Sequence, residues 1–217
     1  MFEFKVVLAI VIAVVFSYLL GSLNSSITVV RLWKKVDIRQ YGSKNAGLTN
    51  TLRVFGKGPA LVTLLCDLAK GVIAVLASRG IAELFGVFND TLFVAYIAGI
   101  FAMIGHIFPL YYGFKGGKGV LMAATTLIAI DPLTFAIVIP FFALILFITR
   151  YVSVSSIIAA IAYPIITLVT QLFRGISTAY MNAGFTLIIA IIIIYLHRPN
   201  IERLRNGTEN KFSFKKK

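Results

Sequence analysis

The chain has 217 residues, of which 59% are hydrophobic, and its mean hydropathy is +0.93. A soluble domain does not place so much apolar surface against water, so the composition excludes that class and predicts an integral membrane protein. The net charge of +13 is explained by basic loops that stay on one side of a membrane, and it does not by itself indicate a nucleic-acid partner.

Apolar runs predict seven transmembrane helices in a single all-α membrane domain that spans residues 1–217. The first run is longer than a signal-peptide core, and no small-residue cleavage site follows it. The single Cys66 excludes an internal disulfide. The seven runs cover about Val6–Val30, Ala60–Ala77, Thr91–Phe108, Val120–Ile130, Leu133–Ile148, Val154–Leu172 and Ala183–Leu196.

The fourth and fifth runs could also form one long helix, and the Lys and Arg residues decide between these alternatives. With a break at Asp131-Pro132 and the N-terminus outside, 17 Lys and Arg residues lie on the cytoplasmic side and three lie outside. A fused helix would place ten on each side. Because cytoplasmic loops carry the excess of basic residues, the separate helices are favoured, and the polar, glycine-rich segments are expected together at the cytoplasmic face of the membrane.

The first cytoplasmic loop is rich in small polar residues and is followed by Arg53. Such residues serve as turn and cap residues in many loops, but a guanidinium can also grip a phosphate group through two parallel hydrogen bonds. We therefore expect the loop to orient substrate oxygens around Arg53. Its candidate residues are Ser43, Asn45, Gly47, Thr49 and Asn50.

Asp67 and Lys70 lie three residues apart inside the second apolar run. Charges at membrane depth are costly, so such residues either act on a substrate or neutralise each other. We favour a structural ion pair that holds this helix against the site.

The segment between the third and fourth runs contains a lysine-bearing glycine loop, Phe114–Gly119. Bare glycines expose backbone amides to an anion, and lysines add point charges, so the loop is typical of a phosphate site. It is not a nucleotide P-loop, because it lacks that spacing and the Ser or Thr after the lysine. The candidate ligands are Lys115, Gly116, Gly117, Lys118 and Gly119.

Two later segments are expected to complete the same pocket. Ser153 follows the fifth run, and His197 and Asn200 open the C-terminal tail. A basic residue at a helix end is usually an interfacial anchor, and a lone histidine there is usually structural.

These motifs, in this order, resemble the bacterial acyl-phosphate-dependent glycerol-3-phosphate acyltransferases, the PlsY family. The sequence departs from the family at Lys44, where glycine is usual, and at Leu48, where alanine is common. The matching segments are Gly21-Ser22, Gly42–Asn50 with Arg53, Asp67–Gly71, Gly105-His106, Phe114–Gly119, Arg150–Ser153, and His197-Arg198 with Asn200, Gly207 and Glu209.

The resemblance implies transfer of a fatty acyl group from acyl phosphate to the sn-1 hydroxyl of glycerol 3-phosphate, which yields lysophosphatidic acid and phosphate. The implied partners are these two substrates and membrane lipids, without nucleic acid, cofactor or metal. An acyl phosphate is already activated, so no strong protein nucleophile is required. The implied catalytic residues are Ser43, Arg53, Lys118 and His197, and the base is either His197 or the phosphate of the donor.

Two other classes of protein fit the sequence less well. A transporter of phosphorylated metabolites or lipids would also need cationic groups near short helices, but the sequence has no evident inverted repeat. A scaffold would not need so many glycines and phosphate-type residues on one face.

Overall fold

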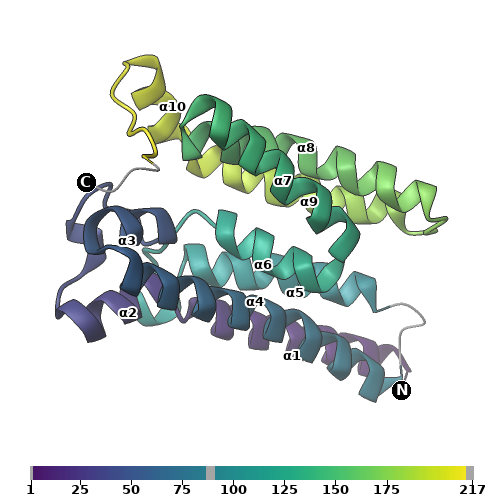
Figure 1. The fold of residues 1–217 in the computed structure, drawn as a ribbon. Coiled ribbons are helices and arrows are strands. Elements are labelled where there is room, and N and C mark those ends of the chain that lie inside the picture. The colour runs from purple at the N-terminus through teal and green to yellow at the C-terminus, as the bar shows by residue number, and fades with distance from the viewer. Residues whose placement is uncertain (1, 87–90, 214–217) are drawn as a thin grey trace. The chain divides into compact units, whose positions relative to one another are not determined.

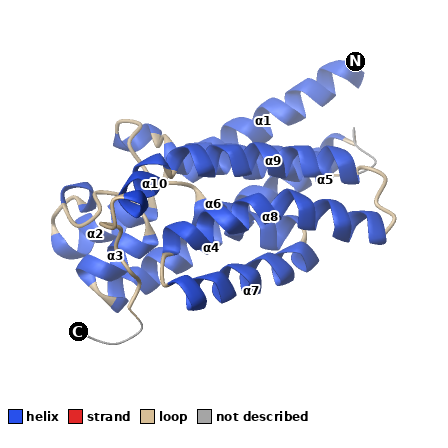
Figure 2. Ribbon diagram, turned by 90° about the horizontal axis from the view of Figure 1, so that it is seen from above, coloured by secondary structure: helices blue, strands red, loops and turns tan. Residues whose placement is uncertain are grey.

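The computed structural model describes residues 2–86 and 91–213, which form helices and loops and contain no strand (Figure 2). The predicted all-α fold is confirmed. Residues 215–217, which entered the charge comparison, lie outside the described part. In chain order the elements are α1 (Phe2–Ser22), α2 (Ser25–Lys34), η1 (Ile38–Gln40), α3 (Leu48–Phe55), α4 (Lys57–Phe85), α5 (Leu92–Ile107), η2 (Leu110–Tyr112), α6 (Val120–Ile130), α7 (Pro132–Thr149), α8 (Val152–Phe173), α9 (Ala179–Leu196) and α10 (Arg198–Arg205).

Six segments of the described chain are long and apolar enough to cross a membrane. Helix α6 has 11 residues, whereas a helical span needs about 20, because each residue adds about 1.5 Å. The predicted break between α6 and α7 is present: Asp131 precedes α7, and Pro132 is its first residue. The count of seven transmembrane helices stays a prediction.

The predicted first span, Val6–Val30, lies within the candidate span Glu3–Lys34, but the helix is interrupted inside it. Helix α1 stops at Ser22, and its 21 residues already extend about 31 Å, the thickness of the hydrocarbon core. A second helix starts after Asn24, whose side-chain Oδ1 accepts a hydrogen bond from Ile27 N at 3.1 Å. Asparagine is a favoured N-cap because it satisfies an otherwise unpaired amide.

The chain divides into two compact units, Met1–Ile130 and Asp131–Lys217, and the prediction of one domain is not tested by this division. In the first unit α1, α4, α5 and α6 lie side by side (Figure 1). Glycines bring α1 and α5 together: a Cβ on Gly21 would meet the backbone of Ala102, and one on Gly105 would meet the carbonyl of Tyr18. Small residues allow this close approach between membrane helices.

In the second unit a buried polar network joins α7, α8 and α9 at one end. Asp131 accepts hydrogen bonds from Arg174 Nη1 at 2.6 Å, Thr134 Oγ1 at 2.9 Å and Gln171 Nε2 at 3.1 Å. Asn182 on α9 donates to Gln171 Oε1 at 2.9 Å. The carboxylate of Asp131 is thus compensated by a cation and by neutral donors, as a buried charge requires.

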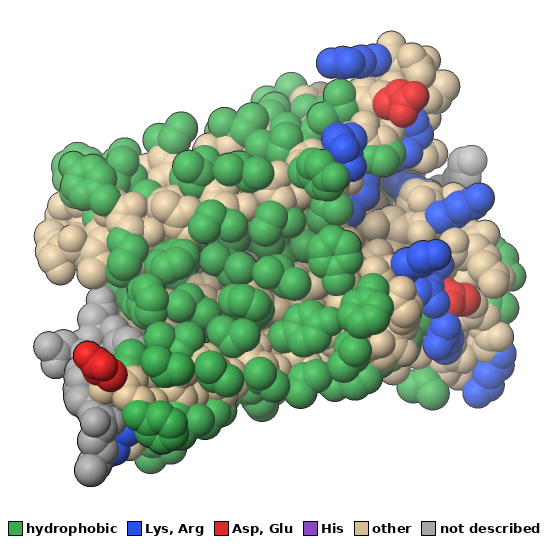
Figure 3. Space-filling model, turned by 180° about the vertical axis from the view of Figure 1, so that it is seen from behind, with side chains coloured by type: hydrophobic (Ala, Val, Ile, Leu, Met, Phe, Trp, Pro, Cys, Tyr) green, Lys and Arg blue, Asp and Glu red, His purple; other side chains and the backbone are tan. Residues whose placement is uncertain are grey.

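Charged side chains are segregated within each unit. On the face seen in Figure 3, hydrophobic side chains cover the sides of the helices. Lys and Arg side chains gather at the end that carries α2 and α3 in the first unit and at the end that carries α10 in the second (Figure 3). This separation agrees with the grouping of loops predicted from the positive-inside rule.

The packing of α4 against α6 can be tested by comparing two glycines of α4. A Cβ on Gly71 would meet the side chain of Thr125, whose Cβ would lie only 2.8 Å away, whereas a Cβ on Gly80 would meet nothing within 4 Å. Gly71→Ala should lower the free energy of unfolding by about 1–3 kcal/mol through overpacking. Gly80→Ala should leave it unchanged or raise it by up to about 1 kcal/mol through helix propensity. Unfolding in detergent micelles measures both, and equal stability of the two variants would contradict the close α4–α6 contact.

Candidate active site

The first loop of the first unit folds around the side chain of Asn50, which is 1% exposed. Its Oδ1 accepts a hydrogen bond from Ser43 N at 3.0 Å. Its Nδ2 donates to the carbonyls of Tyr41 at 3.0 Å and Asn45 at 3.1 Å. Both amide hydrogens are therefore used inside the loop, and Asn50, which was expected to bind substrate, instead shapes the loop that carries Ser43 and Asn45.

The backbone of this loop gives a physical reason for glycine at the position where this sequence has Lys44. Lys44 has a φ of +59°, in the left-handed region that favours glycine, the residue usual at this position in the resembled family. Gly42 has a φ of +57°, and a Cβ there would also meet the side chain of Asn50. Gly47 is extended and precedes α3, where its carbonyl accepts a hydrogen bond from Thr51 N at 3.0 Å.

The glycine loop differs from the expectation that its bare amides face an anion. Gly116 N donates to the carbonyl of Ile107 at 3.0 Å, and Gly117 N donates to the carbonyl of His106 at 3.1 Å. These two amides are occupied by the end of α5. The glycines are required for close packing, because a Cβ on Gly117 would meet His106 Nε2 and would lie 2.7 Å from the carbonyl oxygen of Ala46.

Gly119 lies where the loop enters α6. Its φ is +80°, and a Cβ there would lie 2.6 Å from Met103 Cγ. Both the backbone conformation and the space therefore favour glycine at this position.

Arg39 joins the glycine loop to the segment after α2, and the sequence alone did not single it out. Its Nη1 donates to the carbonyls of Tyr112 at 2.7 Å and Lys115 at 3.0 Å. The same guanidinium pairs with Asp37 Oδ2 at 2.7 Å, and Arg31 pairs with the same oxygen, also at 2.7 Å. The close spacing of Asp37 and Arg39 in the sequence was the signal from which this ion pair could have been predicted.

Asp37 stays charged at neutral pH. The side-chain hydrogen bonds from Arg39 hold the pKa of the Asp37 carboxyl well below its usual range, against the opposing effect of burial. The Asp37–Arg39 pair is therefore a permanent support for the glycine loop.

The predicted pair of Asp67 and Lys70 is confirmed. Asp67 Oδ1 forms an ion pair with Lys70 Nζ at 2.7 Å and accepts a hydrogen bond from Ser25 Oγ at 2.6 Å. The side chains of Asp67 and Lys70 are 0% and 6% exposed. Lys70 Nζ also donates to the carbonyl of Leu23 at 2.9 Å, so the pair ties α4 to the turn between α1 and α2.

The cationic candidates of the first unit lie on segments that these contacts position. Arg53 is exposed in the last turn of α3, Lys115 is exposed on the glycine loop, and Lys118 is partly buried just before α6. Thr49 is partly buried in the first turn of α3. A polar loop and a basic loop thus lie at the same end of the first unit, and Arg39, in the turn before the polar loop, binds the basic one.

In the second unit Asn200 is bound to a carboxylate that the sequence did not propose as a site residue. Asn200 Nδ2 donates to Glu209 Oε1 at 2.7 Å, and Arg203 Nε donates to Glu209 Oε2 at 2.6 Å. Burial acts to raise the pKa of Glu209, but the hydrogen bonds from Asn200 and Arg203 outweigh it and lower that pKa below its ordinary value. The turn at Gly207, with a φ of +67°, brings Glu209 back to α10.

His197 lies at the junction of α9 and α10. Its Nδ1 donates to the carbonyl of Ile193 at 2.7 Å, because a carbonyl oxygen only accepts. The neutral ring then carries its lone pair on Nε2. In the same unit Phe212 N donates to the carbonyl of Arg150 at 2.6 Å, so the tail lies against the turn that precedes Ser153.

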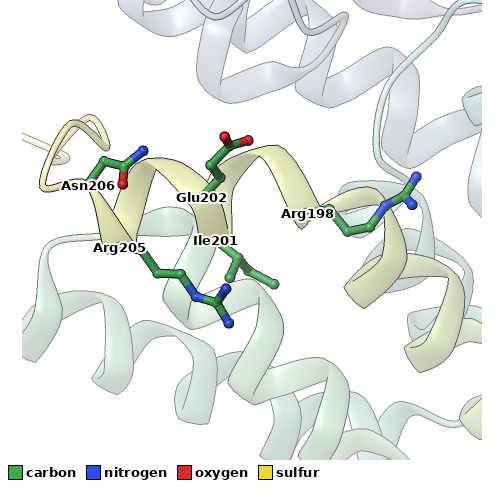
Figure 4. A pocket seen from close by; sticks show the side chains of 5 residues that line it. All are labelled: Arg198, Ile201, Glu202, Arg205 and Asn206. Atoms are coloured by element: carbon green, nitrogen blue, oxygen red, sulfur yellow. The ribbon is translucent and has the colours of Figure 1, made fainter.

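A surface pocket on α10 does not coincide with the predicted site. Figure 4 shows its side chains, and none of the predicted site residues is among them. The pocket is lined by Arg198, Ile201, Glu202, Arg205 and Asn206.

Within residues 2–86 and 91–213, no group of three or more His, Cys, Asp or Glu could hold a metal ion.

Comparison with known proteins gives consistent matches along nearly the whole chain. A family model described as glycerol-3-phosphate acyltransferase matches residues 11–207. A glycerol-3-phosphate acyltransferase of Halalkalibacterium halodurans is 44% identical over 205 residues, which are 94% of this chain and 95% of the relative. One of Chlorobaculum tepidum is 42% identical and covers 94% of this chain and 97% of its own.

Two solved structures of PlsY, an integral membrane glycerol 3-phosphate acyltransferase, share the fold. The glycerol 3-phosphate form has a TM-score of 0.79 and 33% identity, and the match covers 94% of this chain and 96% of that one. The lysophosphatidic acid form has a TM-score of 0.77 and 31% identity, with 94% and 95% covered. The chain therefore belongs to the glycerol-3-phosphate acyltransferase family of integral membrane proteins.

Proposed function

We propose that the chain transfers a fatty acyl group from an acyl phosphate to the sn-1 hydroxyl of glycerol 3-phosphate and releases lysophosphatidic acid and inorganic phosphate. The observation that carries this proposal is that Arg39, in the turn η1 just before the polar loop, binds the carbonyls of Tyr112 and Lys115, so that a polar loop and a lysine-bearing loop lie at one end of a membrane helix bundle. Family membership supports it, because solved relatives are described with glycerol 3-phosphate and with lysophosphatidic acid.

The reaction replaces one bond to the acyl carbon by another. The hydroxyl oxygen of glycerol 3-phosphate attacks the acyl carbon, the bond from that carbon to the phosphate oxygen breaks, and phosphate leaves with its electron pair. The hydroxyl proton passes to a base. Because phosphate is a good leaving group, the protein needs to hold two anions and stabilise the departing one rather than supply a nucleophile.

The first unit supplies the proposed anion-binding residues. Arg53 and Lys118 neutralise phosphate charge, with Lys115 as a further cation on the same loop. Ser43, together with Asn45 and Thr49, orients substrate oxygens. Asn50 and the glycines contribute indirectly, through the shape of the two loops.

The second unit supplies the proposed base, His197. Its Nδ1 carries a hydrogen and donates it to the Ile193 carbonyl. In the neutral ring the lone pair is therefore on Nε2, and this nitrogen is the proposed acceptor of the hydroxyl proton. Ser153 and Asn200 are assigned to substrate contact, and Glu209 holds Asn200 in place. The donor phosphate is the alternative base.

We place the enzyme in the bacterial inner membrane with its basic loops toward the cytoplasm. The supporting argument is the positive-inside rule applied to 17 basic residues against three. Both substrates present a phosphate group to the cytosol. The acyl chain of the donor, by contrast, needs apolar surroundings. Surrounding membrane lipids are therefore partners, and no nucleic acid is expected.

The reaction itself is tested with purified protein, an acyl phosphate and labelled glycerol 3-phosphate. We expect labelled lysophosphatidic acid and one phosphate per turnover, at a rate that EDTA does not change, since no metal takes part in the proposed chemistry. Acyl-coenzyme A should not replace the donor. Turnover with acyl-coenzyme A at an equal rate would refute the donor assignment, and activity lost in EDTA and restored by magnesium would refute the metal-free mechanism.

Arg53→Ala should lower kcat on the order of a hundredfold, equivalent to about 3 kcal/mol of lost transition-state stabilisation. The reason is that phosphate charge grows as the acyl bond breaks. Arg53→Lys should recover only part of the rate, because an ammonium lacks the bidentate fork. Lys34→Ala, which removes an exposed cation at the end of α2, serves as the control. A folded Arg53→Ala enzyme with wild-type kcat would make Arg53 an interfacial anchor instead.

Gly117→Ala should raise the apparent KM for glycerol 3-phosphate by about tenfold or more, because the added methyl group displaces the glycine loop from His106 and Ala46. Gly113→Ala is the control. Gly113 has a positive φ of +67°, which Gly117 does not share, but a Cβ there would meet nothing within 4 Å. Steady-state kinetics of both variants decide the matter, and an equal rise in KM would assign the effect to a general disturbance of the loop instead of to contact with α5.

A further inference from the structure

His106 is a buried side chain that the proposed chemistry does not use. It is 3% exposed and lies in the last turn of α5, directly below the glycine loop. Its two ring nitrogens lie beside different parts of the first unit. Nδ1 lies 3.3 Å from Lys70 Nζ, and Nε2 occupies the position that a Cβ on Gly117 would meet.

Lys70 determines which ring nitrogen accepts a hydrogen bond. An ammonium group has three hydrogens and no lone pair, so it can only donate. Its contacts are Asp67 Oδ1 at 2.7 Å, the carbonyl of Leu23 at 2.9 Å, His106 Nδ1 at 3.3 Å and the carbonyl of Gly21 at 3.4 Å. Nδ1 therefore carries the lone pair, and in the neutral ring the proton is on Nε2, toward Gly117 and Ala46.

The backbone carbonyl of His106 is the second connection. It accepts hydrogen bonds from Gly117 N at 3.1 Å and from Asn24 Nδ2 at 3.4 Å. The same Asn24 Nδ2 lies 3.5 Å from the carbonyl of Ala46 in the first loop. The end of α5, the glycine loop and the first loop thus meet at one residue.

We propose that His106 is a positioning residue for glycerol 3-phosphate, held by the membrane-buried pair of Asp67 and Lys70. It sets the separation between the loop that carries Ser43 and the loop that carries Lys118. This inference rests on the proposed function, because both loops are assigned to the substrate there. The ring is fixed through Nδ1 by Lys70, and the loops are fixed through the backbone carbonyl of His106.

Two substitutions at His106 separate this role from simple packing. An asparagine places its amide oxygen near the position of Nδ1 and can accept from Lys70, whereas a glutamine extends its amide toward the position of Nε2. We expect His106→Asn to keep the KM for glycerol 3-phosphate within about threefold of wild type and His106→Gln to raise it by about tenfold or more, with a smaller change in kcat. Similar KM values for the two variants would overturn the proposal.

Hydrogen exchange gives a measurement that does not depend on turnover. The Gly117 amide is protected in the wild-type enzyme by its bond to the His106 carbonyl, so it should exchange faster in His106→Gln than in His106→Asn. Unchanged protection in His106→Gln would contradict the proposal. If the wild-type enzyme failed to turn over glycerol 3-phosphate while the exchange pattern held, the proposed function would be wrong and the loop support would stand.

A second variant covers the case in which His106→Gln does not fold. Asn24→Asp keeps the Oδ1 that caps α2 by accepting from Ile27 N, but it loses the Nδ2 donor to the carbonyls of His106 and Ala46. We expect the same rise in KM, about tenfold, and faster exchange at Gly117. Wild-type KM and wild-type exchange in Asn24→Asp would overturn the inference.

Discussion

The pair of Asp67 and Lys70 is the interaction on which the first unit depends. A lone charge inside an apolar bundle costs several kcal/mol, so each member needs the other. Lys70 has more donors than Asp67 alone can use, and it places one on Leu23, at the point where α1 has ended and α2 has not begun. The carbonyls released by the end of a membrane helix need donors, and here a buried ammonium supplies one of them.

The glycines of this chain serve mainly to bring parts of the structure close together. Gly21 and Gly105 bring α1 and α5 into contact, and Gly71 receives Thr125 of α6. Gly116 and Gly117 follow the same principle, because their amides bind carbonyls at the end of α5 and their missing side chains leave room for His106. A glycine-rich loop with lysines has the composition of an anion cradle. In this loop, however, the anion-binding capacity resides in the side chains of Lys115 and Lys118 more than in these two amides.

Much of the fold could be predicted from the sequence, because membrane helices are recognised as long runs of apolar residues. The break at Asp131-Pro132 was predictable from charge distribution. The end of α1 was not, since Ile27, Val29 and Val30 continue the apolar run into α2, and only Asn24 marks the cap. Hydrophobicity indicates that a segment is apolar but not in which direction its helix axis runs. A short helix packed against α4 therefore cannot be distinguished, in the sequence, from the continuation of a membrane span.

The site residues were harder to predict because their roles depend on contacts across long stretches of chain. Asn50 has a side-chain amide that is able to bind a substrate, yet this amide forms hydrogen bonds with Ser43, Tyr41 and Asn45. Arg39 looks like another cytoplasmic cation, yet it binds carbonyls more than 70 residues away. Among basic residues, those paired with a buried or half-buried carboxylate support the structure: Arg39 with Asp37 is one such pair. A charge count cannot make that distinction, because support of a loop and binding of a phosphate require the same guanidinium chemistry and differ only in which partner lies within reach.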